Sequence, residues 1–293
     1  MGEHAVVNGG LAIAASIDKE LSIQVQDNND SMHHVSIPDW EVDVTSQKKG
    51  NDIIRALTEI EKALPGSQKF YTFKGKANFP SGSGLGSSGS LALALSQAIA
   101  ADRYPKPSNE AIAAAAHKAE GIFHDTPSGL DVSAIASKGF ISYKNESITT
   151  LPHVQPLNVA IGFSNQSRST KEQIEALKSF REQNTHKVDK VFEAIGNLSE
   201  KALDFLSKNN WETTGKLMTK CHKLLGSIGV STKALDAMVD SANKNGAWGS
   251  KLTGAGGGGC VIAMAPDPIL STIVSSWNSD GYKGFVTLAG SPN

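Results

Sequence analysis

The sequence has few cysteines and no long apolar run, and each absence excludes a class of protein. Its 293 residues contain two cysteines, Cys221 and Cys260, which lie far apart in the chain. Two such thiols cannot form the disulfide framework of a small secreted domain, so we expect both to be buried and free in a cytoplasmic protein. No apolar run reaches about 18 residues, so we expect no helix that spans a membrane.

The sequence also lacks an excess of charge of either sign. The formal net charge is −1 and the Lys and Arg residues are dispersed, which argues against a nucleic-acid partner. The first residues, Met1-Gly-Glu-His, contain neither the basic nor the apolar region of a signal peptide. A chain of this length can form two domains, each with its own core.

The common nucleotide-binding motifs are absent, although glycine is abundant. No Gly-Lys-Ser or Gly-Lys-Thr tripeptide occurs, which excludes a P-loop. A dinucleotide-binding loop requires an acidic residue about twenty residues further on, at the end of a second strand. Asp102 is roughly in range of residues 80–90, but it ends a helical run instead.

One stretch nevertheless has the composition of a phosphate-binding loop. Residues 80–90 (Pro-Ser-Gly-Ser-Gly-Leu-Gly-Ser-Ser-Gly-Ser) contain four glycines, and the apolar run over 91–100 predicts a buried helix directly after them. The first N–H groups of a helix have no intrahelical partner and carry partial positive charge, so we interpret the loop as a phosphate cradle. The alternative is a flexible turn in which Ser87 or Ser88 caps the helix.

The rest of the chain alternates between strand-like and helical segments, and its character changes near residue 153. We expect a short helix or turn and then a strand within residues 5–17. Apolar patterning predicts strands over 21–26, 33–37, 70–79, 139–143, 157–163, 247–252, 260–265 and 285–288. Helical spacing predicts helices over 51–64, 111–123, 171–182, 187–207, 211–226, 232–244 and 268–277.

Two carboxylates, Glu120 and Asp131, flank a turn rich in Thr, Pro, Ser and Gly. Phosphoryl transfer needs a metal ligand and a group that orients the nucleophile, and these two residues could supply them. Taken alone, they fit better as a solvated helix carboxylate and as the N-cap of a helix over 132–136. His124 and Asp125 are further candidates that the sequence does not rank.

A second glycine cluster lies between two predicted strands, in residues 251–260 (Lys-Leu-Thr-Gly-Ala-Gly-Gly-Gly-Gly-Cys). A plain hairpin of this length needs one or two glycines, whereas five of the six residues from Gly254 to Gly259 are glycine. Glycine is unfavourable beside a strand unless another backbone or a ligand must come close. The cluster therefore predicts a close approach at this point.

These motifs, in this order, resemble those of the GHMP small-molecule kinases, which include galactose, homoserine, mevalonate and phosphomevalonate kinases. The resemblance rests on Pro80-x-x-x-Gly-Leu-Gly-Ser-Ser, on Thr126-Pro-Ser-Gly-Leu-Asp131 and on the cluster at 251–260. The opening Gly2-Glu-His-Ala-Val-Val-Asn-Gly is similar to the N-terminal motif of the mevalonate kinases, and Arg168-Ser-Thr-Lys171 is similar to their substrate-side loop. The similarity spans nearly the whole chain.

The resemblance implies an α+β fold of two domains. The first, residues 1–152, would resemble domain 2 of ribosomal protein S5 and bind ATP. The second, residues 153–293, would be ferredoxin-like, with the site in the cleft between the domains. The implied reaction is ATP-dependent phosphorylation of the primary hydroxyl of mevalonate to 5-phosphomevalonate, with Mg²⁺ as cofactor. A homodimer is compatible with the resemblance.

The resemblance also implies roles for individual residues. Asp131 would be catalytic and face the acceptor hydroxyl, while Mg²⁺ would be held by Glu120 and by Ser88, with Ser87 as the less favoured choice. The ATP-binding residues would be Pro80, Gly82, Gly84, Leu85, Gly86, Ser87, Ser88 and Gly89. The substrate side would comprise Glu3, His4, Asp131, Thr170, Gly254 and Ala255, with His4 near the carboxylate of mevalonate.

The chain departs from the family pattern in two places. The family motif begins upstream, as Pro-Gly-Lys-x-x-Leu-x-Gly-Glu-His, so a strand and a lysine that precede Gly2 in the family are not in this sequence. We expect a misassigned start or a shortened chain to explain this. In addition, Gly89 stands where the family usually has Ala, which we expect to weaken the start of the helix by up to roughly 1 kcal/mol without affecting the chemistry.

Two alternative functions stay open. One is another GHMP kinase, such as a phosphomevalonate or sugar kinase, for which Arg168 and Lys171 could bind a substrate phosphate. The other is a non-catalytic metabolite sensor on the same fold. The presence of Glu120, Asp131 and the serine pair favours an enzyme, and an RNA-associated protein of S5-like fold conflicts with the neutral charge.

Overall fold

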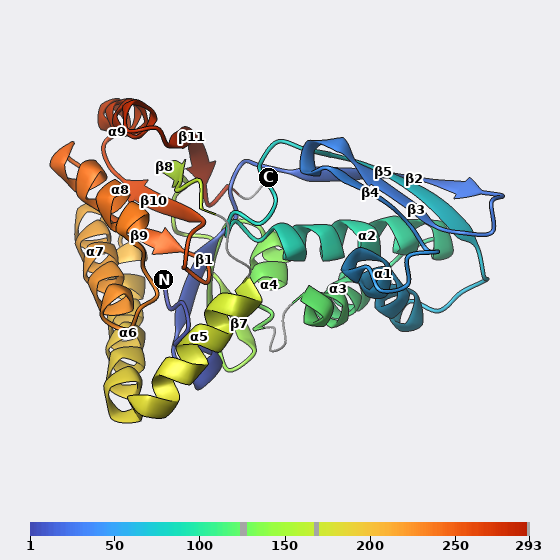
Figure 1. Cartoon of the computed structure of the whole chain (residues 1–293), viewed down its shortest axis with the longest axis horizontal. Helices are drawn as coiled ribbons and strands as arrows, with labels where there is room; N and C mark the ends of the chain where they lie inside the picture. Colours follow the sequence, from blue (N-terminus) through green and yellow to red (C-terminus); the bar gives the residue numbers. More distant parts are fainter. Residues whose placement is uncertain (124–127, 167–169, 292–293) are drawn as a thin grey trace. The chain divides into compact units, whose positions relative to one another are not determined.

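The computed structural model describes residues 1–123, 128–166 and 170–291. The chain forms two compact units, whose helices and strands are labelled in Figure 1. Unit 1 comprises Met1–Asp18, Gly82–Leu85 and Ser137–Asn293, and unit 2 comprises Lys19–Ser81 and Gly86–Ala136. The chain therefore passes between the units four times, whereas the sequence suggested one boundary near residue 153.

Unit 2 consists of a sheet and helices that lie along one of its faces (Figure 1). The strand order is β2-β5-β3-β4, and the pairs are antiparallel except for the parallel pair of β3 and β5. Alternation along β5 places Tyr71 and Phe73 in the core, where both are fully buried. The elements are β2 (Leu21–Asn28), β3 (His34–Ile37), the 3₁₀ helix η2 (Pro38–Trp40), β4 (Val42–Thr45), α1 (Asp52–Ala63), β5 (Phe70–Ala77), α2 (Ser87–Arg103), α3 (Asn109–Phe123) and α4 (Leu130–Ser137).

Unit 1 contains a four-stranded antiparallel sheet in the order β11-β8-β10-β9. Its strands are β8 (Leu157–Phe163), β9 (Gly249–Thr253), β10 (Cys260–Met264) and β11 (Lys283–Ala289). Helices separate β8 from β9, and α9 (Asp267–Ser279) separates β10 from β11. The succession is that of a ferredoxin-like domain, so the predicted fold of the C-terminal part is confirmed.

Helices α7, α8 and α9 pack against this sheet, and α6 packs against α7. The helices before β9 are α5 (Thr170–Gln183), α6 (Thr185–Leu206), α7 (Trp211–Ser227) and α8 (Lys233–Lys244). Trp277 of α9 is fully buried and donates its ring N–H to the carbonyl oxygen of Met238 at 2.9 Å. Cys221 and Cys260 are buried and free, as predicted.

A smaller sheet in unit 1 carries the N-terminal residues. Its order is β1-β6-β7, formed by β1 (Ala12–Ala15), β6 (Phe140–Lys144) and β7 (Ser147–Thr150). The 3₁₀ helix η1 (Val6–Asn8) precedes β1. Met1 exchanges two backbone hydrogen bonds with Ile13 of β1, at 2.7 and 2.8 Å. These bonds fix the path of the Gly2-Glu-His segment beside β1.

The predicted elements are present, with ends shifted by a few residues. Strands β4 and β7 were missed, and the reason is visible in β7, whose four residues are all exposed and show no apolar alternation. Within the described part of the chain, no helix is both long enough and apolar enough to cross a membrane.

Candidate functional site

The glycine-rich loop leads into α2, which begins at Ser87. Gly86 is the N-cap of this helix and has a left-handed backbone with φ of 72°. Ser87 and Ser88 therefore lie in the first turn, and the alternative in which one of them caps the helix is wrong. The N–H groups of this turn point out of the N-terminus of a helix of 17 residues. This is the geometry that binds phosphate.

The middle of the same loop, Gly82–Leu85, belongs to unit 1, where it meets the second glycine cluster. A Cβ on Gly84 would lie 3.0 Å from the carbonyl oxygen of Thr253, and one on Gly254 would lie 3.0 Å from Cα of Gly84. Both glycines also have positive φ, of 81° each. The two glycine-rich segments therefore touch through their backbones, as the second cluster predicted.

The remaining glycines of the cluster are crowded by other backbone segments of unit 1. The N–H of Gly257 donates to the carbonyl oxygen of Val230 at 2.9 Å, and the N–H of Gly259 donates to that of Gln166 at 3.1 Å. A Cβ on Gly256 would lie 2.3 Å from the Val230 carbonyl oxygen. The connection between β9 and β10 is thus a point where several chain segments converge, which explains its composition.

In unit 2, Glu120 lies near the end of α3 and is buried, with 3% of its surface exposed. Its Oε2 atom has no hydrogen-bond partner among the described residues, and His117 Nδ1 lies 3.6 Å from it. Burial, with a further contribution from the negative charge of Asp131, raises the pKa of Glu120 to about 8. The interpretation of Glu120 as a solvated helix carboxylate is therefore wrong.

Asp131 lies in the first turn of α4, which begins at Leu130. It is therefore not the cap of a helix over 132–136. Its carboxylate lies against Gly86 at the start of α2, because a Cβ on Gly86 would be 3.5 Å from both Cγ and Oδ2 of Asp131. The structure thus brings the predicted orienting carboxylate to the first turn of the helix that follows the loop.

The donor set at this point fits a magnesium ion. Glu120 is buried beside the negative charge of Asp131, and its Oε2 has no hydrogen-bond partner among the described residues, so a cation would stabilise its ionised form. No group of three or more His, Cys, Asp or Glu side chains suited to a metal occurs among residues 1–123, 128–166 and 170–291. Mg²⁺ in kinases uses one or two carboxylates and the phosphates of its substrate, so Glu120 and Ser88 would suffice.

In unit 1, Glu3 forms an ion pair with Lys251 of β9, which also donates to the carbonyl oxygen of Leu252. Lys251 is 1% exposed, and Oε2 of Glu3 is buried without a hydrogen-bond partner in the described chain. Burial opposes ionisation of Glu3, but the Lys251 ammonium and the N-terminal ammonium together outweigh it and lower the pKa to about 2. Sequence reasoning missed this pair, although a lysine inside an apolar strand beside the cluster was the available signal.

His4 follows with a left-handed backbone, φ 60°, which is uncommon for a residue other than glycine. Its Nε2 lies 2.9 Å from the carbonyl oxygen of Ala255. Because a carbonyl oxygen only accepts, Nε2 carries the proton and donates. Burial is the main reason that the pKa of His4 is lowered, so the ring is neutral near pH 7. The predicted substrate residues Glu3, His4 and Ala255 are thus linked to one another within unit 1.

Some predicted residues cannot be placed. His124, Asp125 and Arg168 lie outside the described residues, and α5 begins at Thr170, whose side chain is not described.

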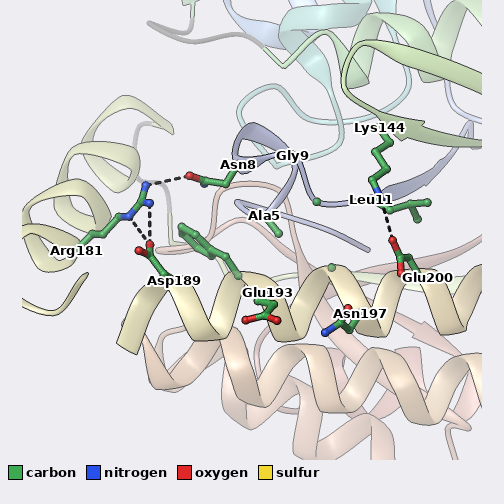
Figure 2. Close-up of a pocket in the computed structure, with 13 residues that line it drawn as sticks. Ala5, Asn8, Gly9, Leu11, Lys144, Arg181, Asp189, Glu193, Asn197 and Glu200 are labelled. Atoms are coloured by element: carbon green, nitrogen blue, oxygen red, sulfur yellow. Dashed lines mark hydrogen bonds and ion pairs between the residues drawn. The ribbon is translucent and has the colours of Figure 1, made fainter. Parts of the chain in front are cut away.

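A separate pocket of about 430 Å³ lies in unit 1 between the N-terminal segment and helices α5 and α6 (Figure 2). At one end, Arg181 donates to Asp189 at 2.9 Å and to Asn8 at 3.0 Å; at the other, Lys144 pairs with Glu200 at 2.9 Å. None of the residues predicted to bind ATP, metal or acceptor lines this pocket.

Comparison with known proteins is consistent with this geometry. The family model "GHMP kinases N terminal domain" matches residues 51–139, and the model "GHMP kinases C terminal" matches residues 202–283. Mevalonate kinase of Pyrococcus horikoshii is 34% identical over 286 residues, which cover 90% of this chain and 85% of that protein. The chain belongs to the GHMP kinase family, and the predicted resemblance is confirmed.

The solved structures that are similar to the model include two mevalonate kinases. That of Methanococcus jannaschii gives a TM-score of 0.83 at 25% identity, covering 98% of this chain and 93% of that one. The L. major enzyme, in complex with R-mevalonate, gives 0.86 at 24% identity, covering 100% and 93%. The predicted α+β fold of the GHMP kinases is confirmed.

We expect Lys251→Met to destabilise the protein by about 3–5 kcal/mol, because it leaves the Glu3 carboxylate buried without its cation. Adding Glu3→Gln should recover much of this loss, since the double variant buries no uncompensated charge. The measurement is urea unfolding of the wild type, both single variants and the double variant.

Lys216→Met is the matched control, because the Lys216–Glu212 pair is exposed and should contribute less than about 1 kcal/mol. The pH dependence is a second readout. The folded-state pKa of Glu3 is lowered to about 2, so its stabilising contribution is present above the ordinary glutamate pKa and lost as the pH falls towards 2. Equal stability of Lys251→Met and Lys216→Met would contradict this account.

Proposed function

We propose that this chain is a kinase that transfers the γ-phosphoryl group of ATP to the primary hydroxyl of mevalonate. The observation that carries the proposal is the contact of Asp131 with the first turn of α2, in a GHMP kinase fold in which the negative charge of Asp131 also acts on the buried Glu120. Mevalonate is favoured as acceptor because the curated relative from P. horikoshii, 34% identical over most of both chains, is a mevalonate kinase.

The first turn of α2 binds the phosphates of ATP in this proposal. Ser87, Ser88 and Gly89 lie in this turn, after Gly86 has turned the backbone into the helix. The first N–H groups of a helix in general have no carbonyl partner within it, and the helix dipole adds partial positive charge. Pro80, Gly82, Gly84 and Leu85 complete the loop, and small side chains let the phosphates approach its backbone.

Glu120 and Ser88 are the residues that would hold Mg²⁺. A bound ion would neutralise the negative charge that develops on the phosphoryl group during transfer. Glu120 must be ionised to be a ligand; burial and the negative charge of Asp131 raise its pKa, and a bound cation would lower it again. Glu120 lies on α3.

Asp131 orients the acceptor hydroxyl and receives its proton. An aspartate with an ordinary pKa near 3.9 is a weak base for an alcohol. Phosphoryl transfer passes through a loose transition state, so little proton transfer is required early and orientation dominates. Fixing the carboxylate against the backbone of α2 suits this role.

Glu3, His4, Gly254 and Ala255 bind mevalonate in this proposal, together with Thr170. The hydrogen bond from His4 Nε2 to Ala255 holds the imidazole ring in place. A neutral ring with its proton on Nε2 presents Nδ1 as an acceptor. His4 is therefore better suited to accept from a hydroxyl of the substrate than to donate to its carboxylate, which revises the role that the sequence suggested.

The acceptor is tested by measuring ADP release from Mg·ATP with mevalonate, phosphomevalonate, homoserine and galactose. We expect turnover with mevalonate to exceed that with each other compound by at least about 100-fold in kcat/KM, since a site built to hydrogen-bond one acceptor rejects analogues that leave its polar groups unpaired. Preference for another acceptor would contradict mevalonate as the substrate, but it would not contradict the assignment to the GHMP kinase family. ATP binding without turnover of any of the four would favour a sensor.

Asp131→Asn should lower kcat by at least about 100-fold, because the amide cannot receive the proton or orient the hydroxyl in the same way. The affinity for ATP, measured by calorimetry, should stay within about threefold, since the phosphates bind backbone groups of α2. Retention of more than a few per cent of the activity would remove Asp131 from the mechanism.

Glu120→Gln should raise the Mg²⁺ concentration needed for half-maximal activity by about tenfold or more, because a neutral amide is a weaker ligand for a hard cation. The measurement is a Mg²⁺ titration at saturating ATP. His117→Gln is the matched control on the same helix: His117 Nδ1 lies 3.6 Å from Glu120 Oε2, yet it has no assigned role in binding the ion. An unchanged titration for Glu120→Gln would count against its role as a ligand.

A further inference from the structure

Strand β9 lies at the edge of its sheet, and helices α7 and α8 pack against it (Figure 1). Alternate N–H groups of an edge strand have no neighbouring strand, so they need acceptors elsewhere. The N–H of Ser250 donates to Oγ1 of Thr219 at 3.1 Å, and the N–H of Leu252 donates to Nδ1 of His222 at 3.3 Å. Both acceptors are side chains of α7. This helix therefore takes the place of a neighbouring strand at two positions of β9.

The bond from Leu252 defines the protonation of the His222 ring, which is buried with 5% of the residue exposed. Because a backbone N–H only donates, Nδ1 accepts and Nε2 carries the proton. Nε2 then donates to Oδ1 of Asp236 in α8 at 3.0 Å. Burial is the main reason that the pKa of His222 is lowered, so the ring is neutral near pH 7 and keeps this pattern of one donor and one acceptor.

Asp236 also accepts from the segment that joins α7 to α8. Oγ of Ser231 donates to the same oxygen, Oδ1, at 2.6 Å. The residue before Ser231 is Val230, whose carbonyl oxygen accepts from the N–H of Gly257 at 2.9 Å. His222 thus holds β9 just before the second glycine cluster, and the Val230 segment holds the cluster itself. Asp236 joins these two attachments.

The part of the cluster between the two attachments includes Gly254 and Ala255. The carbonyl oxygen of Ala255 accepts from Nε2 of His4 at 2.9 Å. A segment made mainly of glycine has many accessible backbone conformations, so its contacts must select one of them. The bonds at Leu252 and Gly257 are two such contacts. They therefore restrict where the carbonyl group that holds His4 can lie.

We propose that His222 and Asp236 are positioning residues for the acceptor: they fix the connection between β9 and β10 and, through Ala255, the ring of His4. The inference rests on the proposed function, in which His4, Gly254 and Ala255 bind mevalonate. His222 and Asp236 act through the backbone of β9 and of the cluster. The phosphates of ATP bind the first turn of α2 in that function, and this turn belongs to the other unit. The pair should therefore affect the use of mevalonate and not the binding of ATP.

The test is steady-state kinetics of ADP release with mevalonate. We expect His222→Ala to lower kcat/KM for mevalonate by about tenfold, because the Leu252 N–H loses its acceptor and small displacements of binding groups are costly. KM for ATP should stay within about twofold. His222→Gln should recover kcat/KM to within about threefold of the wild type, since its amide has one acceptor and one donor, as the neutral imidazole does.

Thr219→Val is the matched control, because it removes the acceptor of the Ser250 N–H. The lost bond is of the same kind and involves the same helix, but it lies two residues further from the glycine cluster. We expect kcat/KM for mevalonate to stay within about twofold of the wild type. Equal losses for Thr219→Val and His222→Ala would overturn the inference, since the effect would then be a general loosening of β9.

The outcomes separate this inference from the proposed function. A wild-type chain that does not phosphorylate mevalonate would remove the function, and the inference with it. An active wild type with His222→Ala within twofold of its kcat/KM would overturn the inference alone.

If circular dichroism shows that His222→Ala does not fold, Asp236→Ala decides the inference. The Asp236 side chain is 55% exposed, so its truncation leaves no cavity in the core. We expect this variant to lower kcat/KM for mevalonate by about fivefold with KM for ATP within twofold, because the His222 ring loses its acceptor and the Val230 segment loses its link to α8. An unchanged kcat/KM for mevalonate would overturn the inference.

Discussion

The proposed site depends on direct contact between backbone segments at glycine residues. In unit 2 the first turn of α2 lies directly against the first turn of α4, with Gly89 and Gly86 facing Asp131. In unit 1 Gly84 lies directly against Gly254. Side chains at these points would hold the segments apart, so the absence of a side chain at each glycine allows the close contact. Backbone contacts also bring N–H groups to the surface at which phosphate is expected to bind.

The buried charges of the two units illustrate two different uses of a carboxylate. Glu3 is matched by Lys251, and the result is a lowered pKa and a fixed N-terminal segment. Glu120 is buried beside another carboxylate: burial and the charge of Asp131 raise its pKa, and its Oε2 has no hydrogen-bond partner among the described residues. The first carboxylate has its counter-ion within the chain. In the proposed function a cation would stabilise the second, and a perturbed pKa of this kind is typical of a functional position.

Much of the fold could be predicted from the sequence because its elements have clear periods and their ends have clear signals. The strand at β5 alternates and α1 ends before Pro65-Gly66, so both were predicted. The exposed strand β7 has no apolar face, and no pattern in the sequence could reveal it. The passage of the chain between two units follows from contacts far apart in sequence, which periodicity does not encode.

The sequence predicted which residues belong to the candidate site better than it predicted how they are arranged. The resemblance identified Glu120, Asp131 and the serine pair, but not which residue caps α2, because Gly, Ser and Asn all serve as caps. It also treated Gly89 as a weak helix residue, since propensity is local while the contact with α4 involves residues more than forty positions away.

The fold does not identify the acceptor, since one fold supports several chemistries. Phosphate binding at α2, cation binding at Glu120 and orientation by Asp131 would serve any alcohol that these kinases phosphorylate. Selectivity must come from groups that meet the rest of the acceptor, and in the proposed function these include His4 and Ala255 of unit 1. Their mutual hydrogen bond leaves one acceptor nitrogen on a buried ring. If this ring meets the acceptor as proposed, a substrate that presents a hydroxyl at the nitrogen would be favoured, whereas one that presents a second anion there would meet no donor from His4.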